Sequence, residues 1–304
     1  MAASTVAMSQ HACVALNGGL CGSNVLSTRT ESGVSFARTP LVKTGLAVER
    51  SAKRLVPISA HVDGLGATLP SGFEMTDYTV VDESFSGSLG GGIMEKIANG
   101  FKSFKENNFR SNPEIFEPLK KGQAPEVMII ACADSRVCPT MLHGLDAGEA
   151  FIVRSVANLV PAYDPSMENG PHGTSAAILY AVTVLGVKKV IVMGHSSCGG
   201  IKALMTMNEF DKDFVGSWVK IGLPAKESTL EAVGDKPLAE QCTFCEKEAV
   251  NNSLKNLLTF DFVEEGVRSG ELEIFGMHYD FHDGKLTSWK ATPSKVAVSA
   301  SVSL

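Results

Sequence analysis

The fold is decided by the stretch Val127-Met128-Ile129-Ile130-Ala131-Cys132-Ala133-Asp134-Ser135-Arg136. It begins as a short continuous apolar run, which is typical of a strand buried on both faces of a parallel sheet. The run closes with a thiol, a carboxylate and a guanidinium. Because open α/β sheets place their chemistry at the carboxyl ends of parallel strands, these polar side chains predict an active site there.

A second apolar run, Val190–Met193, closes with Gly194-His195-Ser196-Ser197-Cys198-Gly199-Gly200. The ends of two parallel strands can lie side by side although they are far apart in the sequence. Together they offer Cys132, His195 and Cys198 to one metal ion. Zinc suits this set, because a catalytic zinc keeps three thiolate or imidazole ligands and an open fourth position. The backbone N–H groups of Gly199 and Gly200 begin a helix, where a small anion is favoured.

The residues that follow Cys132 indicate more than metal binding. In extended backbone Asp134 shares the side of Cys132, and Arg136 continues the alternation and can hold Asp134 by a bidentate pair. A lone cysteine at a strand end is more often a small buried hydrophobe, and a lone Asp-x-Arg is more often a surface pair. However, Cys-x-Asp-x-Arg at 132–136 and His-x-x-Cys-Gly-Gly at 195–200 each follow an expected parallel strand. This shared placement argues against a chance occurrence of the two motifs.

A rival metal site would use Cys242 and Cys245. They lie in what the pattern predicts to be a helix interior. A structural site of four cysteines normally has a second closely spaced pair, which Cys132 and Cys138 do not supply. Core packing is therefore the main interpretation of Cys242 and Cys245, with redox sensing as the minor one.

The remaining periodicity predicts the fold class. Further strands are expected at Phe151–Val153, Leu272–Met277 and Leu286–Trp289, and helices at 173–186, 201–207, 215–221 and 238–258. An N-terminal helical arm carries Ile93, Ile97, Phe101 and Phe104 on one face, which must be buried on its own domain or on a partner subunit. Strands that alternate with helices predict an α/β fold with a Rossmann-like, doubly wound, mainly parallel sheet flanked by helices.

Composition excludes several classes of function. The chain has 304 residues, 44% of them hydrophobic, and a formal net charge of -6. No run of lysines and arginines is interleaved with aromatics, so a nucleic-acid partner is not expected. No apolar run approaches the roughly 18 residues that a membrane span needs. The odd number of cysteines, without a secretory signal, argues against a disulfide framework.

The N-terminal segment differs from the rest of the chain. Residues 1–60 hold six basic and two acidic residues, are rich in serine and threonine, and lack clear periodicity. This segment resembles a chloroplast transit peptide that is removed, with an ordinary disordered tail as the alternative. We expect a flexible linker at 61–90, the folded domain at 91–290 and a loose C-terminal tail at 291–304.

At this point the residues resemble a known family, the plant-type β-class carbonic anhydrases. Cys132–Pro139 is similar to the first signature of that family and Gly194–Ile201 to the second. The similarity covers roughly Ile93 to Trp289. Further similar segments are Gly148–Phe151, Val156–Val160, Trp218–Pro224 and Cys245–Asn251.

The resemblance implies a function and a set of site residues. It implies one zinc ion per subunit on Cys132, His195 and Cys198, an Asp134–Arg136 dyad beside it, and reversible hydration of carbon dioxide to bicarbonate and a proton. It also implies a homodimer or higher homo-oligomer in the chloroplast stroma. The implied substrate pocket, at a dimer interface, consists of Gln123, Phe151, Val156, Tyr180 and the Gly199 amide.

Two other functions stay open from the residues alone. One is a non-catalytic, zinc-containing protein of the same fold that binds a small ligand. The other is a hydrolase that acts on carbonyl sulfide or carbon disulfide. Asp134 and Arg136 argue against pure binding, because a structural metal site needs no such dyad.

Overall fold

The structure is a computed structural model, and it describes residues 80–82, 85, 87, 90–166 and 172–292. The expected transit peptide (1–60) lies outside these residues, as do most of the expected linker (61–90) and of the expected tail (291–304). In the described part of the chain, no helix is long and apolar enough to cross a membrane.

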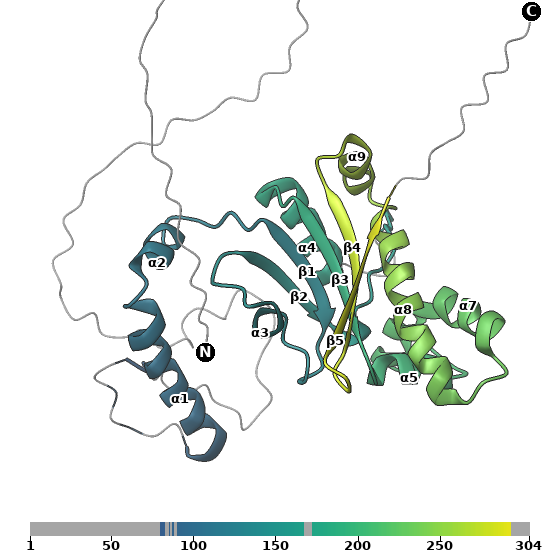
Figure 1. The fold of residues 1–304 in the computed structure, drawn as a ribbon, viewed down its shortest axis with the longest axis horizontal. Helices are drawn as coiled ribbons and strands as arrows, with labels where there is room; N and C mark the ends of the chain where they lie inside the picture. Colours follow the sequence, from purple (N-terminus) through teal and green to yellow (C-terminus); the bar gives the residue numbers. More distant parts are fainter. Residues whose placement is uncertain (1–79, 83–84, 86, 88–89, 167–171, 293–304) are drawn as a thin grey trace, which may run out of the picture. The chain divides into compact units, whose positions relative to one another are not determined.

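A five-stranded sheet forms the centre of the domain (Figure 1). Its order is β2-β1-β3-β4-β5, parallel except for β5, which pairs antiparallel with β4. The expected mainly parallel sheet is therefore confirmed. The expected hairpin turn between β4 and β5 is confirmed as well, at Gly284, where φ is +66°. The strands are β1 (Val127–Cys132), β2 (Ala150–Ser155), β3 (Lys189–His195), β4 (Glu273–Asp280) and β5 (Lys285–Ala291).

Helices cover the two faces of the sheet unequally. Met128, Ile130 and Val190 point to one face and pack with residues of α4 (Gly173–Leu179), α8 (Leu238–Leu257) and α9 (Asp261–Ser269). Ile129 and Ala131 point to the other face, where they pack with Val137 and with Leu145, which follows the short helix α3 (Pro139–His143). The connection from β1 to β2, which contains α3, thus lies on one face of the sheet. The connection from β2 to β3, which contains α4, lies on the opposite face, and β3 pairs with the other edge of β1. The adjacent ends of β1 and β3 are the topological switch point, where open α/β sheets bind their ligands.

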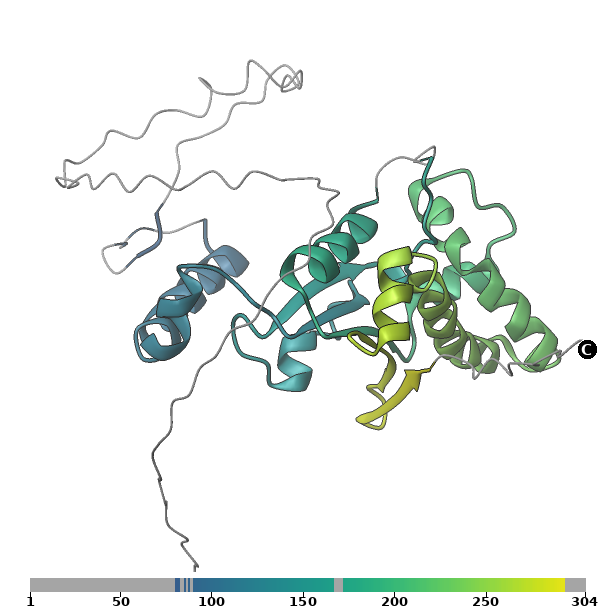
Figure 2. The same ribbon diagram turned by 90° about the horizontal axis from the view of Figure 1, so that it is seen from above.

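Helices α5 (Gly199–Thr206), α6 (Phe214–Val219), α7 (Leu223–Val233) and α8 (Leu238–Leu257), from the second half of the chain, build a helical layer beside the sheet (Figure 2). The other helices of the described residues are α1 (Gly92–Phe104), α2 (Pro113–Leu119), α3 (Pro139–His143), α4 (Gly173–Leu179) and α9 (Asp261–Ser269). π-Helical turns at Lys105–Phe109 and Tyr180–Leu185 continue α1 and α4, and 3-10 turns lie at Val156–Asn158 and Lys220–Gly222.

The expected helix at 215–221 is confirmed as α6 and the 3-10 turn that follows it, which end before Pro224. The sequence did not indicate the next helix, α7, which begins at Leu223 and contains this proline. Proline is tolerated in the first turn of a helix, because the N–H that it lacks has no intrahelical partner there. The expected helix at 173–186 is confirmed and ends at Gly186, which adopts the left-handed conformation with φ +67°.

The N-terminal arm consists of α1, a π-helical turn and α2. Phe104 and Phe116 pack edge to face at 5.7 Å, and Phe109 lies 5.1 Å from Phe116. The expected apolar face of α1 forms, but Ile93 and Ile97 remain 66% and 54% exposed. The arm therefore holds together internally, and the described residues leave much of its apolar face uncovered.

Candidate metal centre and active site

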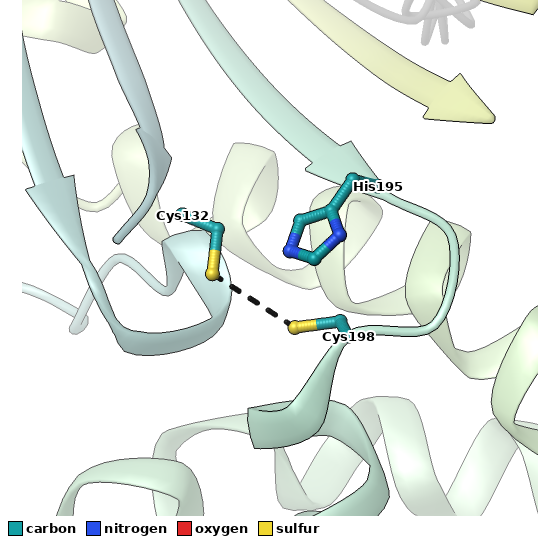
Figure 3. Close-up of side chains that lie close together, drawn as sticks. All are labelled: Cys132, His195 and Cys198. Carbon is teal, nitrogen blue, oxygen red and sulfur yellow. Dashed lines mark hydrogen bonds between the residues drawn. The ribbon is translucent and has the colours of Figure 1, made fainter. Parts of the chain in front are cut away.

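Three side chains converge at the carboxyl ends of β1 and β3 (Figure 3). Cys132 is the last residue of β1, His195 is the last residue of β3, and Cys198 precedes α5. Their ligand atoms all lie within 4.8 Å of one another, and all three residues are buried. In the described part of the chain, no second group of three such side chains comes together.

The donor set and its spacing fit zinc. Two sulfurs that each bind a tetrahedral zinc at about 2.3 Å lie about 3.8 Å apart, and the sulfurs of Cys132 and Cys198 are 4.0 Å apart. Nδ1 of His195 lies 2.9 Å from the Ser196 carbonyl, so an N–H there can donate to it. The Nε2 lone pair then faces the two sulfurs, and this buried atom has no hydrogen-bond partner. A bound metal ion would accept this lone pair, and the hydrogen bond to the Ser196 carbonyl fixes the tautomer that metal binding needs.

The two thiols influence each other's ionisation. A hydrogen bond from the Cys198 thiol lowers the pKa of Cys132 to about 4, and the nearby His195 lowers it as well. The same contact, together with burial, raises the pKa of Cys198 well above the ordinary value of a thiol. The pair alone therefore favours one thiolate, whereas a divalent cation binds both cysteines as thiolates.

Local backbone geometry brings the second signature to the metal centre. Ser197 adopts a left-handed conformation with φ +53°, which turns the chain between His195 and Cys198. A Cβ at Gly200 would lie 2.8 Å from Cγ1 of Val156, so only glycine lets α5 begin this close to the turn after β2. The sequence therefore brings Val156 beside the first residues of α5.

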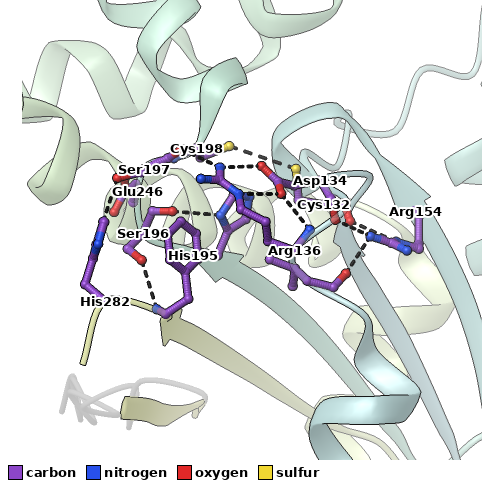
Figure 4. A network of polar contacts seen from close by, with 12 residues as sticks. Cys132, Asp134, Arg136, Arg154, His195, Ser196, Ser197, Cys198, Glu246 and His282 are labelled. Carbon is purple, nitrogen blue, oxygen red and sulfur yellow. Dashed lines mark hydrogen bonds and ion pairs between the residues drawn. The ribbon is translucent and has the colours of Figure 1, made fainter. Parts of the chain in front are cut away.

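Asp134 and Arg136 form the bidentate pair that the sequence predicts (Figure 4). Nε and Nη2 of Arg136 donate to the two carboxylate oxygens of Asp134 at 2.9 and 2.7 Å. This guanidinium holds the pKa of the Asp134 carboxyl well below its usual range. Arg136 also donates to the Ser197 carbonyl at 3.2 Å and lies 4.3 Å above the Phe281 ring, so both signatures fix its position.

The expected substrate residues divide into two groups within one chain. Val156 and Gly199 lie beside the metal centre, at the end of β2 and the start of α5. Gln123 precedes β1, whose length of about 16 Å separates it from Cys132. Phe151 pairs with Met128 near the amino end of the sheet, and its ring lies 6.0 Å from that of Tyr180. A single chain thus does not bring Gln123, Phe151 and Tyr180 to its own metal centre.

Sequence reasoning missed Arg154, Glu246 and His282. Arg154 of β2 donates to the carbonyls of Cys132, Asp134 and Val137, which fixes the loop that carries Asp134. His282 lies 2.9 Å from the Ser197 hydroxyl. Glu246 of α8 accepts the backbone N–H of Cys198. These contacts are made across elements, so spacing along the sequence could not have indicated them.

Comparisons with known proteins agree with this geometry. Residues 127–286 match the family model described as carbonic anhydrase. Beta carbonic anhydrase 3 of Arabidopsis thaliana is 44% identical over 209 residues, which cover 66% of this chain and 80% of that protein. The solved β-carbonic anhydrase CcaA is 27% identical, with a TM-score of 0.61, over 68% of this chain and 94% of its own. A tetrameric β-carbonic anhydrase of Sordaria macrospora is 25% identical, with a TM-score of 0.58, over 66% and 99%.

The structure defines an α/β protein with a mainly parallel sheet and a cysteine–histidine cluster that fits a metal site. The chain belongs to the β-class carbonic anhydrase family and is of the plant type. It is an enzyme for the reversible hydration of carbon dioxide to bicarbonate and a proton.

Proposed function

We propose that the hydration is zinc-dependent and takes place at the carboxyl ends of β1 and β3, with zinc held by Cys132, His195 and Cys198. The observation that carries this proposal is the unpartnered, buried Nε2 of His195, which faces two sulfurs 4.0 Å apart. Zinc, when bound, supplies Lewis-acid activation of the water that attacks carbon dioxide. Cys132, His195 and Cys198 would hold the ion with three protein ligands, the number that is typical of a catalytic zinc site.

Asp134 accepts a hydrogen bond from the attacking water and directs its lone pair toward the carbon of the substrate. A carboxylate does this only while it is ionised, as a free aspartate already is at neutral pH, and the ion pair with Arg136 lowers the pKa of Asp134 further. The contacts of Arg136 with the Ser197 carbonyl and the Phe281 ring hold the carboxylate toward the metal centre. Arg136 is thus a positioning residue for Asp134.

The substrate pocket is completed by a second copy of the chain. Val156 and the Gly199 amide come from the subunit that holds the metal, and Gln123, Phe151 and Tyr180 come from the other. Two observations support this arrangement. The second group lies toward the amino end of its own sheet, and the apolar face of α1 is exposed. A homo-oligomer that covers this face would also bury the arm. The apolar Phe151 and Val156 suit an uncharged linear substrate, while Gln123 can donate to a developing bicarbonate oxygen.

The basic, hydroxyl-rich segment 1–60 supports a chloroplast transit peptide and a stromal enzyme. The linker at 61–90 and the β-carbonic anhydrase domain at 91–290 belong to the same proposal, with the domain extended by the last residue of β5, Ala291, which was expected in the C-terminal tail. Expression of the full chain as a fluorescent fusion in leaf cells tests the compartment. We expect fluorescence throughout the stroma, and loss of that location when residues 1–60 are deleted.

One assay tests the reaction. Carbon dioxide hydration is measured by stopped flow on the zinc-loaded protein and on the metal-free protein, beside carbonyl sulfide and carbon disulfide hydrolysis. We expect rapid, zinc-dependent hydration of carbon dioxide. Full activity without metal would contradict the zinc assignment, and turnover of the sulfur compounds alone would replace the substrate.

A further inference from the structure

Behind Cys198 lies a buried polar pair that the proposed reaction does not use. Glu246 of α8 and His278 of β4 have side chains only 2% and 5% exposed, and Oε2 of Glu246 lies 3.1 Å from Nε2 of His278. Removing two such groups from water is costly, and an apolar pair of the same volume often stabilises a fold as well or better. A buried pair at this position therefore calls for an explanation other than core stability.

Glu246 also contacts the metal centre. Its other oxygen, Oε1, accepts the backbone N–H of Cys198 at 3.3 Å. This N–H lies in the turn that begins α5, where backbone donors have no intrahelical partner. Glu246 thus links α8, β4 and the backbone of Cys198. His278 holds the carboxyl group in the orientation that reaches Cys198.

The packing of α8 on β3 makes this contact possible. Gly194 pairs with His278 in the register of β3 and β4. A Cβ at Gly194 would lie 2.9 Å from Val250 and 3.4 Å from the Glu246 carbonyl. The absence of a side chain at Gly194 therefore lets α8 approach close enough for Glu246 to reach the end of β3.

We propose that Glu246 and His278 are positioning residues for the metal ligand Cys198, and that they strengthen zinc binding by fixing the turn from which its thiol projects. The inference rests on the proposed zinc site. Partners of metal ligands typically contribute a factor of about 10 to 100 in metal affinity or activity. Because the contact is to the backbone of Cys198, it acts on the position of the sulfur.

The test compares Glu246→Leu, Glu246→Gln and His278→Leu, with Glu248→Leu as the matched control. Glu248 lies on the same helix, is half-buried and bonds Asn251 instead of the metal centre. Zinc dissociation constants are measured by competition with a chelator. We expect binding to weaken about 10- to 100-fold in Glu246→Leu and about tenfold in His278→Leu. Glu246→Gln, which keeps an acceptor for the Cys198 N–H, should retain most of the affinity, and the control should match the wild type.

A second readout separates positioning from general stability. Melting temperatures are compared for the metal-free and zinc-loaded forms, because a ligand stabilises the folded state in proportion to its affinity. We expect a smaller gain on zinc loading in Glu246→Leu. An equal loss in both forms, with wild-type zinc affinity, would overturn the proposal. If Glu246→Leu does not fold, the zinc dissociation constant of His278→Leu provides the test. A wild-type zinc affinity in His278→Leu would then overturn the proposal. A wild-type protein that binds no zinc would instead contradict the proposed function.

Discussion

The two ends of the sheet differ in what one chain can accomplish alone. At the carboxyl end, Cys132, His195 and Cys198 are buried and within 4.8 Å of one another. Toward the amino end, Phe151 and Tyr180 pack at the edge strand, and Tyr180 is 46% exposed. The cysteine–histidine cluster that we propose to bind zinc is therefore complete within a single chain. The substrate pocket, in our proposal, is a property of the assembly.

The largest effect should follow from removing one proposed metal ligand at the carboxyl ends of β1 and β3. In Cys198→Ala, zinc affinity should fall by several orders of magnitude and hydration should fall to background, because two ligands and water hold zinc poorly. Assembly should persist, since the arm is untouched. Metal analysis beside light scattering measures both properties. Cys242→Ser is the control, because Cys242 is half-buried at the edge of a hydrophobic cluster and belongs to no metal-ligating group in the described residues. Full zinc in Cys198→Ala would contradict the ligand set.

The next effect separates chemistry from metal binding. Asp134→Asn keeps the shape of the side chain but replaces one acceptor oxygen by a donor. We expect zinc content to stay at one per subunit and turnover to fall about 100-fold or more. Asp211→Asn, on an exposed surface pair with Lys220, is the matched control. Near-normal turnover in Asp134→Asn would refute the assigned role.

A smaller effect is expected from weakening the association of subunits through α1. Ile97→Ser with Phe101→Ser removes apolar area from the exposed face of α1. If a second copy covers this face, each truncation weakens association by about 1 kcal/mol or more, so together they raise the dissociation constant roughly 30-fold. Sedimentation velocity over a dilution series measures the shift. Zinc content should not change, whereas activity should fall on dilution together with the oligomer. Lys96→Ser on the same helix serves as the control, and unchanged assembly in the double variant would exclude the arm from the interface.

The same difference explains what the sequence could predict. Strand ends and i, i+3 spacing are local features, so the sequence alone predicts that Cys132, His195 and Cys198 meet. The Asp134–Arg136 pair was also predicted, but the structure forms it in a turn after β1, where the Val137 N–H donates to the Asp134 carbonyl at 3.1 Å, and not on the extended chain that the prediction assumed. Arg154, Glu246 and His282 reach the centre from other elements, so their positions depend on how those elements pack together. The pocket residues came only from family resemblance, because no local pattern shows which ones a second chain would supply.

The smallest expected effect concerns pH. Arg136 depresses the pKa of Asp134, so the carboxylate contributes stability that is present above its unfolded value of about 3.9 and is lost as pH falls through the folded value. In Arg136→Gln the pKa should return toward that ordinary value, which still leaves Asp134 almost fully ionised at pH 7. The variant should therefore lose turnover through misorientation alone. The ratio of variant to wild-type turnover should then stay constant between about pH 6.5 and 8.5, which lies well above that pKa. Stopped-flow profiles with zinc content checked at each pH measure it. A ratio that rises steeply across this range would mean that Arg136 acts by keeping Asp134 ionised, and the positioning role would fail.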